Sequence, residues 1–185
     1  MTSNNWIQSL RCLRCEASDL QWRDARDFDG ERLPTDGALV CGNCGARYPI
    51  ADRILDMHAR DAALTLAGRS NQAPLTPFVY ERMWRPRSLP ILSGGRLSAR
   101  GELQLLREWA PLQAHHLALD LGSATGLYAR TLAAMDASAT VVALDLAPNM
   151  LRASHLYARR AGVRNIAHLR AAADRLPFAT ASVNL

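Results

Sequence analysis

The chain contains no lysine. All 22 of its basic residues are arginine, against 17 acidic residues, which gives a formal net charge of +5 over 185 residues. GC-rich coding, which favours Arg and Ala codons, explains such a whole-chain bias more simply than phosphate recognition by guanidinium groups does. The positive charge therefore does not by itself indicate a nucleic-acid partner.

Long apolar runs are also missing, since none approaches the roughly 20 residues that a membrane-spanning helix needs. The segment Met1 to Ile7 has neither a basic start nor an apolar core, so we expect no export signal, no membrane partner and a cytoplasmic location. With 21% charged and 49% apolar residues, the composition is that of a globular chain. This length predicts one modest domain plus a small one.

Cysteine is scarce, but its four copies form two equally spaced pairs, Cys12-x-x-Cys15 and Cys41-x-x-Cys44. Two such pairs are typical of a tetrahedral zinc site, in which the short gap lets both thiolates of a pair reach one ion. Four thiolates leave no open coordination position, so we expect structural zinc. Two disulfides are the alternative, and they require an oxidising compartment.

A glycine-flanked turn, Gly122-Ser-Ala-Thr-Gly126, follows the apolar segment Leu117 to Leu121. A second apolar segment, Val141 to Leu144, ends at Asp145. This pattern is typical of a nucleotide-type site at the carboxyl ends of parallel strands, where Asp145 would accept hydrogen bonds from ribose hydroxyls. The turn lacks the third glycine of the nicotinamide dinucleotide fingerprint. A strand, turn and helix without a ligand is the alternative.

Three motifs resemble those of the class I S-adenosylmethionine-dependent methyltransferases, type 11-like. They are Asp120-Leu-Gly-Ser-Ala-Thr-Gly126, Asp145-Leu-Ala-Pro-Asn-Met150 and Ala173-Asp-Arg-Leu-Pro-Phe178. The family usually reads Asp-Leu-Gly-Cys-Gly-Thr-Gly in the first motif, so Ser123 and Ala124 depart from it. The resemblance implies S-adenosylmethionine as cofactor and methyl transfer as reaction. The implied cofactor-binding residues are Asp120, Gly122, Ser123, Gly126, Asp145, Leu146, Ala173 and Asp174.

The resemblance also implies a role for each of these residues. Asp120 would position the loop or the amino group of the cofactor, and the glycines would lie against its methionine part. Asp145 would bind ribose, Leu146 would lie against adenine, and Asp174 would approach the adenine amino group. The alternative is that Asp120 and Asp145 only cap the turns that follow them and that Asp174 is a solvated N-cap.

The expected fold class is α/β, a Rossmann-like parallel sheet with flanking helices preceded by a small zinc-ribbon β domain. Strands are expected near 117–121, 140–145 and 165–169, and helices near 126–136 and 148–161. The expected divisions are a ribbon at 10–57, a linker and helical cap at 58–115, and a cofactor-binding half-domain at 116–185. Residues 181–185 are expected to form a fourth strand, after which the methyltransferase fold would be truncated and open to a protein partner.

The cap is expected to contain a short helix at 78–85, which ends at Pro86, and a helix from Ser98 through Trp109. In related methyltransferases this region covers the cofactor and substrate cleft. Tyr80 and Trp84 are therefore substrate-cleft candidates, with plain helix packing as the alternative.

The methyl acceptor is open between an RNA base and a small molecule. The layout is similar to that of bacterial rRNA guanine-N1 methyltransferases, and an arginine cluster in the cap is a candidate for phosphate contacts. A non-catalytic module, whose ribbon binds RNA or a partner methyltransferase, is the alternative, as is a weakly active or inactive fragment. No catalytic base can be named. The arginines of the cluster are Arg82, Arg85, Arg87, Arg96 and Arg100.

Overall fold

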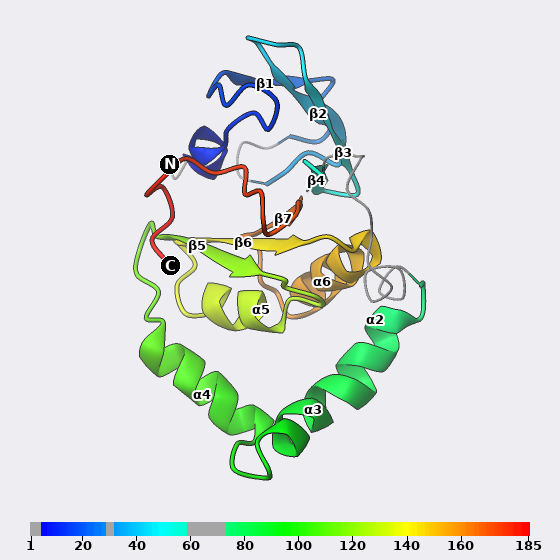
Figure 1. The fold of residues 1–185 in the computed structure, drawn as a ribbon, viewed down its shortest axis with the longest axis vertical. Helices are drawn as coiled ribbons and strands as arrows, with labels where there is room; N and C mark the ends of the chain where they lie inside the picture. The colour runs from blue at the N-terminus through cyan, green and yellow to red at the C-terminus, as the bar shows by residue number, and fades with distance from the viewer. Residues whose placement is uncertain (1–4, 29–31, 59–72) are drawn as a thin grey trace.

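A single mixed sheet organises the computed structural model, which describes residues 5–28, 32–58 and 73–185 (Figure 1). The strand order in this sheet is β1-β2-β3-β4-β7-β6-β5. The strands are β1 (Leu20–Arg23), β2 (Asp36–Cys41), β3 (Arg47–Ala51), β4 (Ile54–Asp56), β5 (Leu117–Leu121), β6 (Thr140–Asp145) and β7 (Ile166–Arg170). The helices are the 3₁₀ helix η1 (Asn5–Ser9), α2 (Thr76–Val79), the π-helix η2 (Tyr80–Trp84), α3 (Arg85–Leu92), α4 (Ala99–Trp109), α5 (Leu127–Ala133) and α6 (Pro148–Arg160).

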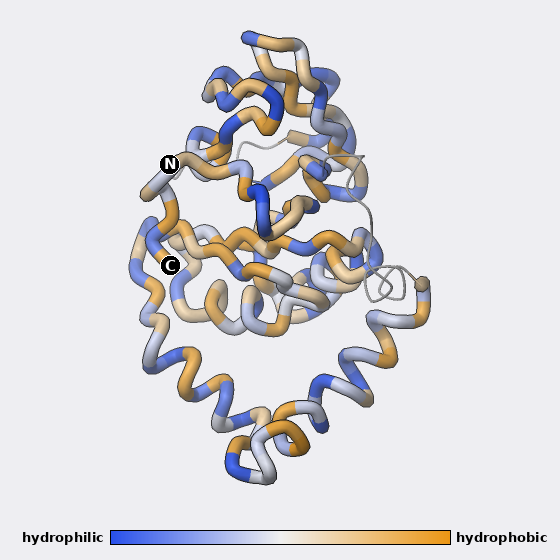
Figure 2. The backbone as a smooth tube through the Cα atoms, viewed as in Figure 1, coloured by the Kyte–Doolittle hydropathy of each residue, from blue (hydrophilic) through white to orange (hydrophobic). Residues whose placement is uncertain are grey.

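The second half of the chain alternates strands and helices as predicted, and β5, β6 and β7 pair in parallel. Four consecutive residues of β6, Val141 to Leu144, are buried, as expected for a parallel strand covered on both faces. The tube through β5 and β6 is accordingly largely hydrophobic (Figure 2). Pro148 stands in the first turn of α6, where its missing amide costs no hydrogen bond. The expected α/β class with a Rossmann-like parallel sheet is confirmed.

The N-terminal strands join that sheet instead of forming a sheet of their own. Strands β1 to β4 are an antiparallel meander, and β4 then pairs in parallel with β7. The pairing extends past the strand, because the amide of Met57 donates to the carbonyl of Arg170 at 2.8 Å. Leu39 and Leu55 from the meander share one apolar core with Leu144 and Leu169. The division at 57/58 and 115/116 stays a prediction, and residues 59–72 of its middle part lie outside the described residues.

The helix expected to end at Pro86 instead continues to Leu92, so that prediction is wrong. The chain passes from α2 through the π-helical turn η2 into α3, and the amide of Arg85 bonds the carbonyl of Tyr80 at the junction. Pro86 then falls in the first turn of α3, where a proline is tolerated. The predicted cap of α4 is confirmed, because the Ser98 hydroxyl accepts from the amide of Gly101 at 3.1 Å.

Residues 181–185 run beside β5 but form no regular strand, contrary to the prediction. Asn184 N donates to Leu117 O, and Leu119 N donates to Leu185 O, both at 2.8 Å. The Asn184 side-chain oxygen accepts from Leu117 N at 2.9 Å. A side-chain amide thus replaces a main-chain carbonyl at this step, which interrupts the ladder. None of the helices that the structure describes combines the length and apolar character needed to cross a bilayer.

Candidate cofactor site and cysteine cluster

The turn after β5 is held in the conformation that its two glycines permit. Gly122 and Gly126 have φ of 70° and 72°, in the left-handed region that favours glycine. A Cβ added to Gly126 would lie 2.0 Å from the Ser154 hydroxyl oxygen of α6 and 3.0 Å from its Cβ, so a larger residue would require Ser154 to shift. A Cβ at Gly122 would meet no heavy atom of the described residues within 4 Å, so among these residues the turn faces open space at that point.

Asp145 ties the tip of β6 to this turn. One carboxylate oxygen accepts from the amide of Ala124 and the other from the amide of Ala147, each at 2.8 Å. The amides of Gly122 and Ser123 both donate to the carbonyl of Leu144, at 2.9 and 3.0 Å. The carboxylate therefore does cap turns, as the alternative proposed. Each of its oxygens also keeps a lone pair for a further donor.

Asp120 points toward the helix that follows the turn. Its carboxylate accepts from the amide of Ala129 in α5 at 2.9 Å. Burial raises the pKa of Asp120 to about 6, and the charge of Asp145 adds to the effect. This carboxylate therefore fixes α5 relative to β5.

The two residues that depart from the family motif differ in their surroundings. Ala124 has φ of 47°, so a non-glycine residue occupies the left-handed region where the resembling family has glycine. That conformation costs a residue with a Cβ roughly 1–2 kcal/mol. The Ser123 hydroxyl is buried and finds no hydrogen-bond partner among the described residues. Buried hydroxyls without a hydrogen-bond partner are rare in folded proteins. They occur where a ligand or a water molecule supplies the missing partner.

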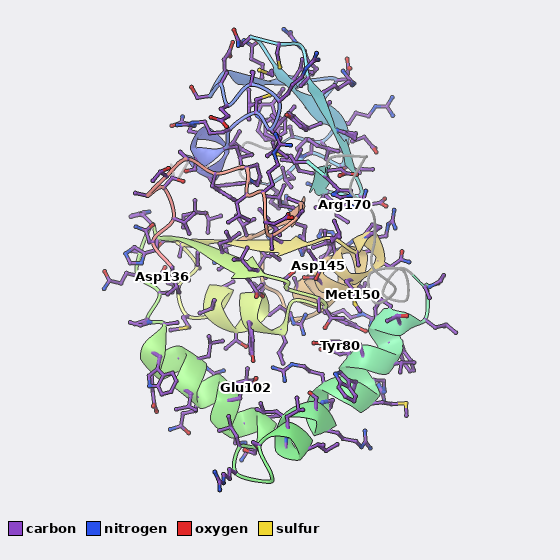
Figure 3. The ribbon with its side chains drawn as sticks, viewed as in Figure 1. Tyr80, Glu102, Asp136, Asp145, Met150 and Arg170 are labelled. Carbon is purple, nitrogen blue, oxygen red and sulfur yellow. The ribbon has the colours of Figure 1, made fainter. Side chains whose placement is uncertain are left out.

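The remaining predicted cofactor residues follow β6 and β7 at the same end of the sheet. Leu146 is half-buried, and its carbonyl accepts from Arg170 Nε at 3.0 Å. Ala173 and Asp174 lie on an exposed turn after β7. Figure 3 shows Asp145 and Arg170 at one end of the sheet and Asp136 at the other.

Two carboxylates of the cap, which sequence reasoning missed, dock it on the turn and on α5. Glu81 of η2 accepts from the Thr125 hydroxyl and, at 2.8 Å, from the guanidinium of Arg130. Glu102 of α4 accepts from Arg85 of α3 at 2.7 Å and from the hydroxyl of Tyr128. Partners up to 49 residues apart leave no local signal in the sequence.

The aromatic and basic candidates of the cap differ in their burial and in their contacts. The Arg85 guanidinium is paired with Glu102, lies 5.0 Å from the Tyr128 ring centroid, and has a side chain only 13% exposed. It is therefore poorly placed for a phosphate contact. Tyr80 is half-buried and burial raises its pKa, whereas Trp84 is 55% exposed. Tyr80 lies on the side of the molecule that carries Asp145 (Figure 3).

The four cysteines come together as predicted, with all sulfur atoms within 4.8 Å of one another. The sulfurs of Cys12 and Cys44 are 3.5 Å apart, and those of Cys15 and Cys41 are 3.6 Å apart. Tetrahedral zinc with bonds of about 2.3 Å separates its sulfur ligands by roughly 3.8 Å. None of the four cysteines is in a disulfide, and their arrangement fits such an ion.

The two cysteine turns repeat the same hydrogen bonds. Cys12 N donates to Ala17 O as Cys41 N donates to Ala46 O, both at 2.9 Å. Glu16, with φ of 59°, holds the left-handed position that Gly45 holds in the second turn. The first pair therefore builds the same turn without glycine.

Side chains near the cluster stabilise its sulfurs. The hydroxyl oxygen of Tyr48 accepts a hydrogen bond from the amide of Leu13 at 2.8 Å and lies 3.1 Å from the Cys12 sulfur. Asn43 donates to the Cys15 sulfur at 3.5 Å, and this contact lowers the pKa of the Cys15 thiol to about 6. The sequence analysis did not predict the contact of the Tyr48 hydroxyl with the cysteine cluster.

A cavity of about 1050 Å³ lies away from both sites. Its lining includes His115, His116, Thr140 and Asn165, which stand at or before the amino ends of the parallel strands. Ligands of open α/β sheets bind outside the carboxyl ends, so this cavity is not the cofactor site.

Comparisons with known proteins agree with this topology. Residues 118–185 match the family model described as a methyltransferase domain. The chain is 28% identical over 154 residues to an uncharacterised chloroplastic methyltransferase of Arabidopsis thaliana, covering 78% of this chain and 43% of that protein.

A solved structure shares the fold over much of the chain. Phosphoethanolamine N-methyltransferase 2 of Haemonchus contortus, in complex with S-adenosylmethionine, superposes with a TM-score of 0.50 at 18% identity, over 74% of this chain and 29% of that one. The chain thus spans less than half the length of either protein. It has the Rossmann-like fold of the methyltransferases, and its methyltransferase domain match begins in β5.

Proposed function

We propose that the chain binds S-adenosylmethionine at the carboxyl ends of β5, β6 and β7 and transfers its methyl group to an acceptor. The observation that carries this proposal is Asp145. Its carboxylate stands at the end of a buried parallel strand, is fixed by two backbone amides, and lies beside a left-handed glycine turn. Parallel α/β sheets bind nucleotide-type ligands at such a point.

The residues present fit that cofactor. The turn faces open space at Gly122, where a backbone can approach the methionine part of a ligand. The Ser123 hydroxyl has no partner among the described residues and would gain one. Asp145 would hold the ribose hydroxyls with its free lone pairs, and Leu146 would lie against the adenine. Ala173 and Asp174 would complete the adenine side.

The cofactor, when bound, supplies a methyl group on a positively charged sulfur that an acceptor can attack. The chain's own residues would supply position, since holding two reactants aligned gives much of the rate in such a displacement. Asp120 fixes α5 behind the turn, and Glu81 holds the cap against it. Half-buried Tyr80 would then border the acceptor. We name no general base.

We also propose structural zinc at Cys12, Cys15, Cys41 and Cys44, supported by their separations and by the repeated turns. Metal analysis of the purified chain is expected to give one zinc per chain, and a Cys41→Ser variant is expected to lose it. Purified protein that contains no metal and holds its four cysteines in two disulfides would contradict the assignment.

We also propose a class of methyl acceptor, a location and a site for a protein partner. An acceptor of small size is favoured over RNA, because Arg85 of the cluster is already engaged by Glu102 and Tyr128. We expect a cytoplasmic protein. A protein partner would lie against the outer side of residues 181–185, which are themselves bonded along the β5 edge.

Titration calorimetry of the zinc-loaded chain with S-adenosylhomocysteine tests the function, with Asp145→Ala as the site variant. Asp136→Ala is the matched control, because Asp136 also caps a turn, accepting from Ser138 N at 2.8 Å, but lies at the other end of the sheet. We expect micromolar binding that Asp145→Ala abolishes and Asp136→Ala preserves. Folded, zinc-loaded protein that releases no heat would refute the cofactor site and favour a non-catalytic ribbon that binds RNA or a partner methyltransferase.

A further inference from the structure

Three charged residues form one row across the sheet where its strands end. In the β6–β7 pairing Asp145 is the partner of Arg170, and in the β4–β7 pairing Arg170 is the partner of Asp56. All three strands are parallel, so their carboxyl ends meet at the same edge. The meander, which carries Cys41 and Cys44, therefore adds a strand end to the candidate cofactor site.

Arg170 joins the two sides of this row through a single guanidinium group. Its Nη1 donates to Asp56 Oδ2 at 2.8 Å, and its Nε donates to the carbonyl of Leu146 at 3.0 Å. Leu146 directly follows Asp145, whose carboxylate also accepts from Ala147. The turn that would hold ribose and adenine is therefore bonded to β7, and through β7 to β4.

We propose that Arg170 is a positioning residue for the adenosine part of the cofactor, oriented from the cysteine-bearing meander by Asp56. This inference rests on the proposed function. Arg170 holds the Leu146 carbonyl and so sets the place of the Asp145–Leu146 turn. Asp56 fixes the guanidinium plane, so the meander contributes to cofactor affinity without touching the ligand.

The chemistry of the guanidinium explains why arginine is needed. Its planar fork donates from Nε and Nη1 at the same time in fixed directions, whereas a lysine ammonium is a single point on a flexible stem. The side chains of Arg170 and Asp56 are only 22% and 31% exposed, so water screens this pair less than a surface pair.

A second ion pair provides a matched control. Arg152 of α6 donates through Nε to Asp52 in the turn between β3 and β4, at 3.1 Å, so it too joins the meander to residues 116–185. The side chains of Arg152 and Asp52 are 53% and 66% exposed. Arg152 also donates to the side chain of Asn149, and not to the strand-end turn. Removing it breaks a similar connection away from the Leu146 carbonyl.

The experiment compares Arg170→Lys, Asp56→Asn, their combination and the control Asp52→Asn by calorimetric titration with S-adenosylhomocysteine and with adenosine. We expect Arg170→Lys to weaken both ligands about tenfold and Asp56→Asn about threefold, while Asp52→Asn changes either by less than about twofold. The double variant is expected to match Arg170→Lys alone, because Asp56 acts through Arg170. Losses that multiply, or unchanged affinities in both variants, would overturn the inference.

Amide exchange separates this inference from the proposed function, because it needs no ligand. The amide of Ala147, bonded to Asp145, is expected to exchange faster in Arg170→Lys and Asp56→Asn than in Asp52→Asn. Wild-type protein that binds no ligand would refute the cofactor site alone, whereas unchanged exchange at Ala147 would refute the positioning role.

Discussion

Two buried groups are expected to give the stability of this chain opposite pH dependences, which single substitutions can separate. His168 of β7 is 1% exposed, its Nε2 lies 3.1 Å from the Ser154 hydroxyl, and burial lowers its pKa to about 3. Burial raises the pKa of Asp120 to about 6. The unfolded chain restores ordinary values of about 6.5 for histidine and 3.9 for aspartate.

The signs follow from which state takes up the proton first. As the pH falls below 6.5, unfolded His168 is protonated while the folded side chain stays neutral, so stability is lost toward pH 3. Asp120 does the reverse: the folded carboxyl is protonated first, so its contribution is full below about pH 3.9 and is lost as the pH rises through about 6. Between pH 7.5 and 5.5, linkage gives a loss of about 1.4 kcal/mol from His168 and a gain of about 0.8 kcal/mol from Asp120.

Urea unfolding of the zinc-loaded, ligand-free chain at these two pH values tests the reasoning with His168→Gln and Asp120→Asn. Each variant is compared with itself across pH, so the packing cost of the substitution cancels. On acidification His168→Gln is expected to lose about 1.4 kcal/mol less than wild type, and Asp120→Asn about 0.8 kcal/mol more. If both variants follow the wild-type pH dependence, the pKa shifts assigned to burial are wrong.

Two further substitutions test backbone conformation. Glu16→Gly, in the first cysteine turn, is expected to raise the free energy of unfolding by up to about 1 kcal/mol. Glycine adopts φ of 59° without the steric cost, and Gly45 holds the equivalent position in the second turn. Urea unfolding measures the change, and a less stable variant would contradict the repeated-turn description. Gly126→Ala is expected to lower the free energy of unfolding by about 2–3 kcal/mol, because φ is 72° at this position and the added Cβ would lie 2.0 Å from the Ser154 oxygen. A second substitution, Ser154→Gly, is expected to recover part of that loss. Equal melting of the single and double variants would show that the clash is not the cause.

The elements that local sequence determines were predicted well. Strand β6 is a run of buried apolar residues, α4 begins at a serine cap, and the cysteine spacing brings four sulfurs together. The prediction failed at Pro86, because a π-helical turn placed this proline where its missing amide is tolerated. It failed at 181–185 because the Asn184 side chain takes a hydrogen bond of the expected ladder. Both outcomes depend on individual hydrogen bonds, which periodicity does not record.

The joining of the meander to the parallel sheet was beyond local reasoning for a different physical reason. Strand β4 has three residues, too few for any period to show, and its partner β7 begins more than a hundred residues later. What directs it there is the turn at Asp52 and Arg53, both with positive φ, which reverses the chain after β3 as a two-residue hairpin loop. Ile54 and Leu55 are then buried, and Asp56 meets Arg170. A pairing this short is stabilised by the shared core and one ion pair, so the end of β4 stays in place at the candidate cofactor site only while the cysteine-bearing meander is folded.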